Sequence, residues 1–422
     1  MKKPKGINIS TFLFGVLSLM LFCNFNGILN NIFGVNAALS PVILVLSFAM
    51  LILTKPKKKL FSYPFISFML TLLSLWYMGL ISGLVHYDYT NFKNGDQLFA
   101  TRLIFSSFLI FYVFSSYMSG LSKERKSKHV KFVLFLFIFT SSIGVLESLF
   151  GFRTVSLDLA YDTERTLGFF GNPNLTGLQA NLSLALVIGL FLANKLKVLT
   201  TLVLVPIVAY SAAASFSKTA IITASLLLVM FFVLLIWNML NLKNRIQARR
   251  SFSIIAILTV ISFVVVVPLA ISYYDDLGFG QKERLTSIVD LVAEGKFNRK
   301  TSSMRSEIFK DGIEIIKKDV FLGHGLSTFS MGGMFKSSPT HGVHNIFLKL
   351  IGEGGILPLM FFLTFILSFS FKAMQKKNRE YLYLCLFPIL SFSLYCFTSH
   401  NALEDKFAVA LLAILVGVLS DD

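Results

Sequence analysis

The feature of this chain that most limits its fold is a series of twelve apolar runs, most of them long enough to cross the hydrocarbon core of a bilayer. Apolar residues make up 55% of the 422 residues, and charged residues only 14%. A water-soluble domain could not bury so much apolar surface. We therefore predict an all-α, polytopic integral membrane helical bundle with about 12 transmembrane helices. The predicted spans are residues 10–29, 37–54, 63–85, 98–119, 132–150, 174–193, 198–214, 219–238, 251–272, 343–371, 381–398 and 406–420.

These spans divide the chain into three parts. Residues 1–272 hold spans one to nine, residues 273–342 form a large loop, and residues 343–422 hold spans ten to twelve. The seventh and eighth spans are separated only by Ser215-Phe-Ser-Lys218, so a single re-entrant element is an alternative to two crossings. Cys385 and Cys396 share one predicted helix and lie too far apart along it to form a disulfide.

The basic residues indicate how the bundle is oriented. With a cytoplasmic N-terminus, more than half of the 39 lysines and arginines fall on the cytoplasmic side, together with few of the 22 acidic residues. We therefore predict that both termini are cytoplasmic and that the loop of residues 273–342 is external. The net charge of +17 is explained by this asymmetry, because the basic residues lie between apolar runs, and we do not expect nucleic-acid binding.

The large loop contains two segments with helical periodicity. Leu285, Ile288, Val289 and Val292 keep helical spacing in the first. In the second, Phe309, Ile313, Ile316 and Val320 form an apolar stripe, and Arg305 lies one turn before it. We expect a helical cap that packs on the bundle and brings Arg305 toward His344. The alternative is an amphipathic hairpin with a solvated Arg305.

A polar stripe lies at the start of the predicted tenth span. His341, Asn345, Lys349 and Glu353 recur at every fourth position, so on a helix they would share one face beside apolar neighbours. Unpaired polar groups are costly in a membrane, and their presence there indicates a functional site. We select His341, Asn345 and Glu353 as candidate substrate-binding residues.

A candidate anion site precedes the sixth span. Asn172 is a suitable N-cap and Pro173 suits the first helical position, so backbone N–H groups at the positive end of this helix would face outward. Arg165 lies seven residues earlier and could close over a phosphate held there. The alternative is an ordinary cap with an unrelated arginine.

Three external cations, Arg165, Lys218 and Arg305, exceed what orientation requires. Together they could hold a pyrophosphate, whose charge is spread over several oxygens. Lys218 could instead extend its ammonium to the membrane surface. Glu147, near the external end of the fifth span, could pair with one of these cations or lie at the interface without a special role.

The histidines raise the question of a metal. His341 and His344 have a spacing that metal ligands adopt, but no cysteine and no recognised carboxylate pattern accompanies them, so we predict no metal and no cofactor. His324, between two glycines, is typical of a turn. General acid–base chemistry suits His344 better, because the ordinary pKa of histidine lies near neutrality.

Several of these segments together resemble the O-antigen ligase and Wzy-type polysaccharide polymerase superfamily, mainly in the second half of the chain. Lys218 stands where that family usually has arginine, which keeps the charge but loses the bidentate fork. The resembling segments are Arg165 to Asn174, Ser215-Phe-Ser-Lys218, Arg305-Ser-Glu-Ile-Phe-Lys-Asp-Gly312, Phe321-Leu-Gly-His-Gly-Leu326, His344-Asn-Ile-Phe-Leu348 and Gly352-Glu-Gly-Gly-Ile356.

The resemblance implies a glycosyltransferase in a bacterial plasma membrane, with its active site on the external face. Such enzymes transfer a glycan from an undecaprenyl-pyrophosphate carrier to an acceptor hydroxyl, without a metal and with inversion. We expect a polymerase of capsule, exopolysaccharide or O-antigen repeat units, with His344, Arg305 and Lys218 as catalytic residues. A ligase of finished glycan is the alternative within the class, and a lipid-linked oligosaccharide transporter is the alternative outside it. Expected partners are the lipid-linked donor, the glycan acceptor, membrane lipid, a flippase and a chain-length regulator.

Overall fold

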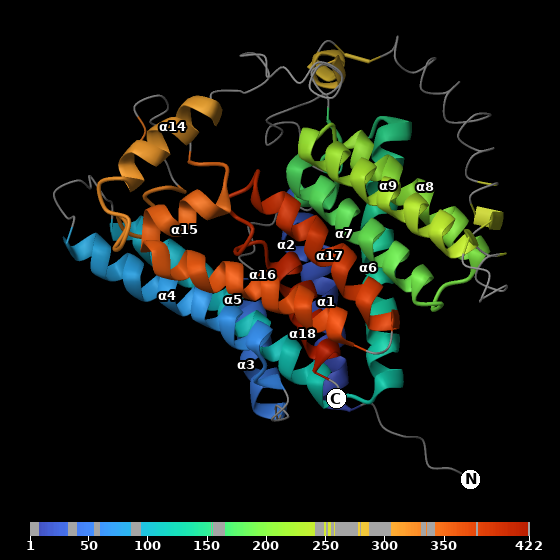
Figure 1. Ribbon diagram of the computed structural model, residues 1–422, viewed down its shortest axis with the longest axis horizontal. Coiled ribbons are helices and arrows are strands. Elements are labelled where there is room, and N and C mark those ends of the chain that lie inside the picture. The colour runs from blue at the N-terminus through green and yellow to red at the C-terminus, as the bar shows by residue number, and fades with distance from the viewer. Residues whose placement is uncertain are drawn as a thin grey trace.

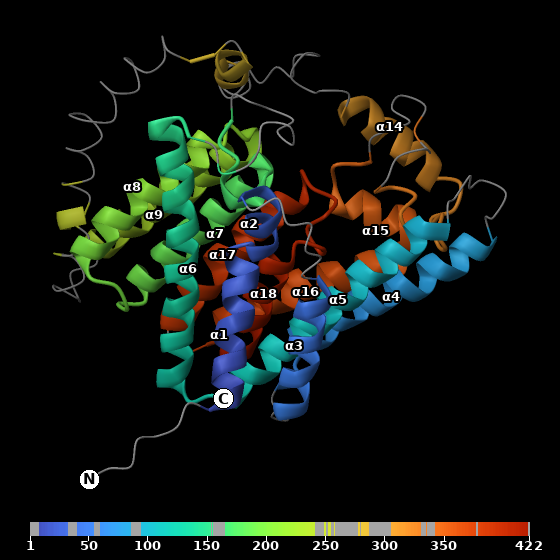
Figure 2. The same ribbon diagram turned by 180° about the vertical axis from the view of Figure 1, so that it is seen from behind.

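The structure is a computed structural model, and all of its described elements are helices (Figures 1 and 2). The described parts contain no strand, in agreement with the predicted all-α class. The structure describes residues 8–32, 40–54, 60–85, 94–152, 154, 165–240, 249, 252–254, 257, 277–278, 280–286, 305–330, 335, 342–376 and 379–420.

Helices account for eleven of the twelve predicted spans. Six helices are long and apolar enough to cross a membrane: α4 (Tyr63–Val85), α5 (Asn94–Gly120, its apolar part from Gln97), α6 (Lys123–Phe150), α7 (Pro173–Leu192), α9 (Lys218–Leu240) and α16 (Ile356–Gln375). Five others are apolar but shorter: α1 (Ile9–Phe22), α3 (Ser40–Leu53), α8 (Val198–Ala214), α17 (Arg379–Cys396) and α18 (Lys406–Leu419). The predicted span 251–272 lies mostly outside the described residues, so the number of full crossings remains a prediction.

The centre of the bundle is formed by α7 and α18. Both helices are almost entirely buried, as expected for helices with no face toward lipid or water. α18 is apolar on every side, whereas the first half of α7 also buries polar side chains such as Gln179 and Asn181. α7 packs along α17, α18 along α5, and α16 along α4. Gly189 and Gly417 allow two of these contacts, because a Cβ at Gly189 would lie 2.9 Å from the Leu384 backbone and one at Gly417 would lie 2.8 Å from the Ser115 carbonyl.

Two predicted spans are wrong in their limits, because each contains a break. The first ends at Phe22, where Asn24 adopts a left-handed conformation (φ 46°), and α2 (Phe25–Ile32) follows. The predicted span 343–371 is divided at Gly355 (φ 74°) into α15 (Ile346–Gly354) and α16. A side chain at Gly355 would collide with the Phe321 carbonyl, so only glycine fits this junction.

The Ser215-Phe-Ser-Lys218 segment joins two separate helices, α8 and α9, which pack against each other and against α7. Phe216 has a positive φ of 47°, an unusual conformation for a bulky residue, and the Ser215 hydroxyl accepts a hydrogen bond from the Ser217 N–H (3.2 Å). α8 has 17 residues, or about 25 Å of helix, which is near the lower limit for a crossing.

The described part of the large loop includes α14 (Arg305–Ile316), which packs on α15 (Figure 1). A helix is present as predicted, and Ile316 and Val320 of the predicted stripe pack in a small core with Phe329 and Val343. Phe309 of the stripe is instead 43% exposed, and its neighbour Ile308 is buried. The returning chain that carries Phe329 covers the face beside Ile308 and thereby decides which side of α14 is buried. For the first predicted loop helix, the structure describes helical residues 280–286, and Ile288, Val289 and Val292 lie outside the described residues.

Candidate functional site

Buried polar groups gather at one end of the bundle. The C-terminal ends of α6 and α17 and the N-terminal ends of α7 and α18 lie there, because these helices pack side by side in alternating directions. The turn between α8 and α9 joins them through its contact with Arg165, and α15 joins them through contacts with the α17–α18 link, residues 397–405. We define the candidate site as the polar groups at this end.

Arg165 connects the start of α7 to the turn between α8 and α9. Its Nε donates to the Ser215 carbonyl (2.9 Å) and its Nη2 donates to Asn174 Oδ1 (3.3 Å). Arg165 is 7% exposed. Asn172 is the N-cap of α7, as predicted, and its Oδ1 accepts from the Asn174 N–H (2.9 Å). The structure therefore brings together the arginine and the helix terminus that the sequence indicated.

Glu147 fixes the segment that carries Arg165. Its carboxylate is 2% exposed and accepts hydrogen bonds from the Leu167 N–H (3.2 Å), the Gly168 N–H (2.9 Å) and the Thr154 hydroxyl (3.0 Å). The described bonds give Glu147 a structural role beside the candidate anion site, and its predicted pairing with an external cation stays a prediction.

The predicted polar stripe of α15 is only half correct. Asn345 is the N-cap rather than a helical residue, with its Oδ1 accepting from the Leu348 N–H (3.0 Å), so the chain before it does not continue the helical face. His341 lies outside the described residues. Lys349 and Glu353 do share a face, and both are buried in protein at 2% and 1% exposure.

Lys349 forms an ion pair with Glu404 of the α17–α18 link. Burial acts to lower the pKa of Lys349, but the nearby carboxylates of Glu404 and Glu353 outweigh it and raise this pKa. The ammonium therefore stays charged. Because Lys349 is fully enclosed, the pair ties α15 to the link between the last two described helices.

Glu353 anchors the end of the large loop. Its Oε1 accepts from the Phe329 N–H (3.2 Å), the Ser330 N–H (3.0 Å) and the Ser330 hydroxyl (2.8 Å). Burial raises the pKa of this carboxyl. These contacts favour a positioning role for Glu353, while its predicted contact with substrate stays a prediction.

His324 lies in a turn, as predicted. Gly323 and Gly325 both have positive φ, and His324 donates its backbone N–H to the Gly352 carbonyl (2.7 Å). Ser82 of α4 donates to the Gly323 carbonyl (2.6 Å). The turn therefore fastens the large loop to α15 and α4.

His344 lies beside His400 of the α17–α18 link, with 5.4 Å between the ring centroids. Burial, together with the nearby Lys349 and His344, lowers the pKa of His400 to about 3, so this imidazole is neutral at physiological pH. Its Nδ1 is buried without a hydrogen-bond partner among the described residues. Burial raises the pKa of the neighbouring Asp405 carboxyl to about 7, although the Tyr395 hydroxyl donates to it (3.0 Å).

The two parts of the site are connected through the start of α18. Phe407 packs against Phe170, which belongs to the segment held by Glu147, with 4.9 Å between ring centroids. Three residues earlier in the chain, Glu404 reaches Lys349. The Arg165 part and the His344 part therefore flank the same short link.

The three predicted catalytic residues lie on separate elements. Lys218 is the first residue of α9, three positions after the Ser215 carbonyl that Arg165 contacts, and Arg305 is the first residue of α14. His344 immediately precedes the N-cap of α15. Their convergence on one substrate stays a prediction. Among the described residues, no group of three or more histidines, cysteines and acidic residues could hold a metal ion.

We did not predict that the α17–α18 link belongs to the candidate site, to which it contributes His400, Glu404 and Asp405. The available signal was their concentration in nine residues between two apolar runs. The fold and the site define a class of protein: a multi-pass helical membrane protein with paired and buried polar groups at one end of its bundle.

Residues 202–363 match the family model described as O-antigen ligase. This match confirms the predicted resemblance to the O-antigen ligase and Wzy-type superfamily over these residues. The matched segment contains Lys218, Arg305, His344 and Glu353, but neither Arg165 nor Glu404. A search of curated proteins found no match.

Proposed function

We propose that this protein polymerises undecaprenyl-pyrophosphate-linked oligosaccharide repeat units by inverting, metal-independent glycosyl transfer. The observation that carries the proposal is the contact of Arg165 with both the start of α7 and the α8–α9 turn. This places a guanidinium, a helix N-terminus and the lysine-bearing turn around one small region. Such an arrangement favours a pyrophosphate leaving group, on which negative charge accumulates as the glycosidic bond breaks.

The acceptor belongs to the His344 part of the site in this proposal. His344 takes the proton from the attacking hydroxyl, which bonds to the anomeric carbon as the sugar–phosphate bond breaks and the lipid pyrophosphate leaves. The neutral His400 beside it adds no positive charge that would suppress proton uptake by His344. Lys349 lies close enough to help lower the pKa of His400, but its ion pair with Glu404 offsets its charge.

A ligase that transfers finished glycan is the second candidate, because the matching family model is described as O-antigen ligase. The match also favours glycan transfer over the transporter alternative. Analysis of the lipid-linked glycan in a deletion strain distinguishes a polymerase from a ligase. Loss of a polymerase leaves single lipid-linked repeats, whereas loss of a ligase leaves full-length polymer on the lipid. Accumulation of full-length polymer would replace our proposal with the ligase.

We further propose that the candidate site faces the outside of a bacterial plasma membrane. The three cysteines are buried, so an introduced thiol can be labelled against a low background. Ser306→Cys on the exposed side of α14 should react with an impermeant thiol reagent in intact cells. Lys128→Cys at the other end of α6 should react only after the cells are opened. The reverse pattern would invert the proposed orientation.

A further inference from the structure

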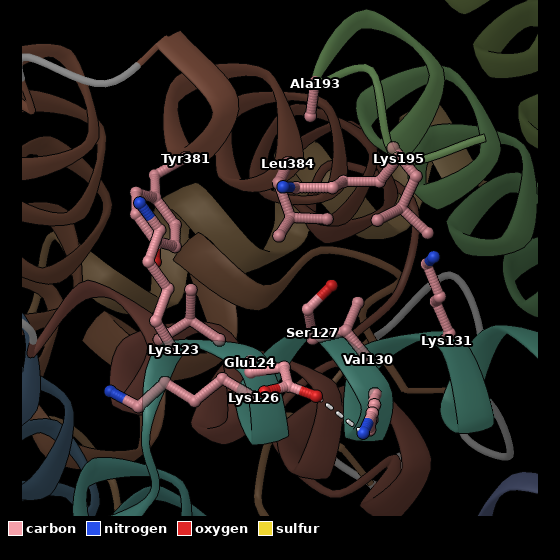
Figure 3. A pocket seen from close by; sticks show the side chains of 13 residues that line it. Lys123, Glu124, Lys126, Ser127, Val130, Lys131, Ala193, Lys195, Tyr381 and Leu384 are labelled. Atoms are coloured by element: carbon pink, nitrogen blue, oxygen red, sulfur yellow. Dashed lines mark ion pairs between the residues drawn. The ribbon is translucent and has the colours of Figure 1, made fainter.

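A second charged region lies at the opposite end of the bundle from the candidate site. A cavity of about 560 Å³ opens there between the start of α6, the end of α7, the start of α17 and the end of α18 (Figure 3). Lys123, Lys126, Lys128, Lys131 and Lys195 line it, and among the described lining residues Glu124 is the one acidic residue. We call it the lysine pocket.

The charges of the lysine pocket favour an anion. Glu124 pairs with Lys128 (2.7 Å), and both side chains are largely exposed, so this pair lies at the rim. Lys123 lies over the ring of Tyr381, 5.3 Å from its centroid. The side chains of Lys123, Lys131 and Lys195 surround the opening in Figure 3. These three lysines therefore line the pocket in addition to the rim pair and Lys126.

Lys126 has a separate structural role. It is 1% exposed, and its Nζ donates to the Gly417 carbonyl (2.8 Å) near the C-terminal end of α18. A lysine in this position satisfies a carbonyl that the helix leaves without a partner and offsets the negative end of the helix dipole. Lys126 thus has a structural role in α18, whereas the side chains of Lys123, Lys131 and Lys195 line the opening of the pocket.

Two positive and two negative helix ends lie around the pocket. The first turn of α6, with its outward-facing N–H groups, begins at Lys123, and the N-cap Ser122 makes no side-chain bond to them. The first turn of α17 carries Tyr381. The negative end of α18 is offset by Lys126. The negative end of α7 also borders the pocket through Leu190 and Ala193, so the lysines rather than the helix ends give the pocket its positive charge.

The floor of the pocket identifies the kind of anion. Val130, Leu190, Leu384 and Val418 line the pocket with buried apolar side chains. The pocket also opens at the ends of helices that cross or enter a membrane, where lipid headgroups lie. Basic pockets between transmembrane helices bind anionic headgroups. We propose that the lysine pocket binds the phosphate-bearing headgroup of an anionic membrane lipid, with part of the lipid's apolar chain against this floor.

The test uses the full-length protein in uncharged detergent, to which phosphatidylglycerol, phosphatidylcholine or inorganic phosphate is added. Binding is followed by native mass spectrometry and by the shift in Tm. The pocket variant is Lys123→Gln/Lys131→Gln/Lys195→Gln. The matched control is Arg125→Gln/Lys197→Gln/Lys376→Gln, which removes the same charge at the same end of the bundle from residues that do not line the pocket. Lys126 is unchanged in both, so that α18 keeps its C-terminal bond.

We expect phosphatidylglycerol to bind the wild type and raise its Tm, and phosphatidylcholine to do neither. The pocket variant should bind phosphatidylglycerol about tenfold more weakly, whereas the control should bind as the wild type does. Both variants should keep the wild-type Tm in lipid-free detergent. Equal loss in both would show general charge attraction, and an equal effect of inorganic phosphate would show a soluble anion site. Either result, or unchanged binding by the pocket variant, would overturn the proposal without touching the proposed glycan transfer.

Discussion

Lys349 of α15, which is buried, and Glu404 of the α17–α18 link, which is partly buried, form an ion pair although they lie 55 positions apart in the chain. Removing one partner leaves the other charge buried and uncompensated, so Lys349→Met or Glu404→Gln alone should reduce the free energy of unfolding by about 3 kcal/mol. The double variant should recover part of this loss. Thermal unfolding of the purified variants measures the coupling, and additive losses would show that the two side chains do not depend on each other.

Arg165→Lys tests the contact between the α8–α9 turn and the start of α7. The variant keeps the charge, but an ammonium cannot reproduce the guanidinium's fixed pair of bonds to Ser215 and Asn174. We expect the KM for the lipid-linked donor to rise about tenfold or more, with a smaller change in acceptor use. Steady-state kinetics with each substrate varied in turn provide the measurement. An unchanged donor KM would return Arg165 to a purely structural role.

Lys218 should act through its charge alone. Lys218→Arg should keep much of the activity and Lys218→Met should lose most of it, whereas a lysine that only extends to the membrane surface would tolerate both. Lys317→Met, at an exposed position on the large loop, is the control and should have little effect. Arg305→Lys should reduce activity more than Lys218→Arg does, since a guanidinium that holds two phosphate oxygens has no ammonium equivalent.

His344→Ala should lower turnover by about 100-fold to 10,000-fold if the imidazole is the general base, with little change in donor binding. The matched control is His129→Ala, because His129 lies near the start of α6, at the end of the bundle opposite the candidate site. A chelator should not affect the wild type. Turnover of the purified protein is the readout, and wild-type turnover in His344→Ala would remove this residue from the mechanism.

Asp405 should make stability depend on pH. Burial raises the pKa of its carboxyl from 3.8 to about 7, so the folded protein favours the protonated form. This contribution to stability is fully present below about pH 4 and is lost as the pH rises through 7. From pH 5 to pH 8, the wild type should therefore lose stability relative to Asp405→Asn, by about 2.6 kcal/mol. The difference in Tm between the two proteins, measured across this range, tests the assignment, and a constant difference would refute it.

The sequence predicted well what depends on local patterns. Apolar runs located the membrane helices, Asn172 marked the N-cap of α7, and the glycines around His324 marked a turn. Each of these signals lies within a few residues of the feature it predicts. The glycines near residue 355 were visible too, but continuous apolarity concealed the break that Gly355 makes.

The sequence could not predict contacts whose partners are far apart in the chain. Nothing in the sequence near Glu404 indicates that its ion-pair partner is Lys349. Likewise, nothing within α14 shows whether Ile308 or Phe309 is buried, because this depends on Phe329 in the returning loop. Ile308 and Phe309 are both apolar and adjacent in the chain, so helical periodicity alone does not show which of them is buried. The structure supplied these pairings and with them the part of the site formed by the α17–α18 link.

The enclosed position of α18 has a consequence for biogenesis. Its neighbours in the bundle, α1, α5, α6, α16 and α17, all precede it in the chain and so leave the ribosome first. During membrane insertion they must hold open the space that α18 later fills, or separate to admit it. Until α18 arrives, the Lys126 ammonium lacks its bond to the Gly417 carbonyl, and Glu404 has not yet reached Lys349. Entry of this one helix therefore completes the polar contacts at both ends of the helical bundle in a single step of assembly.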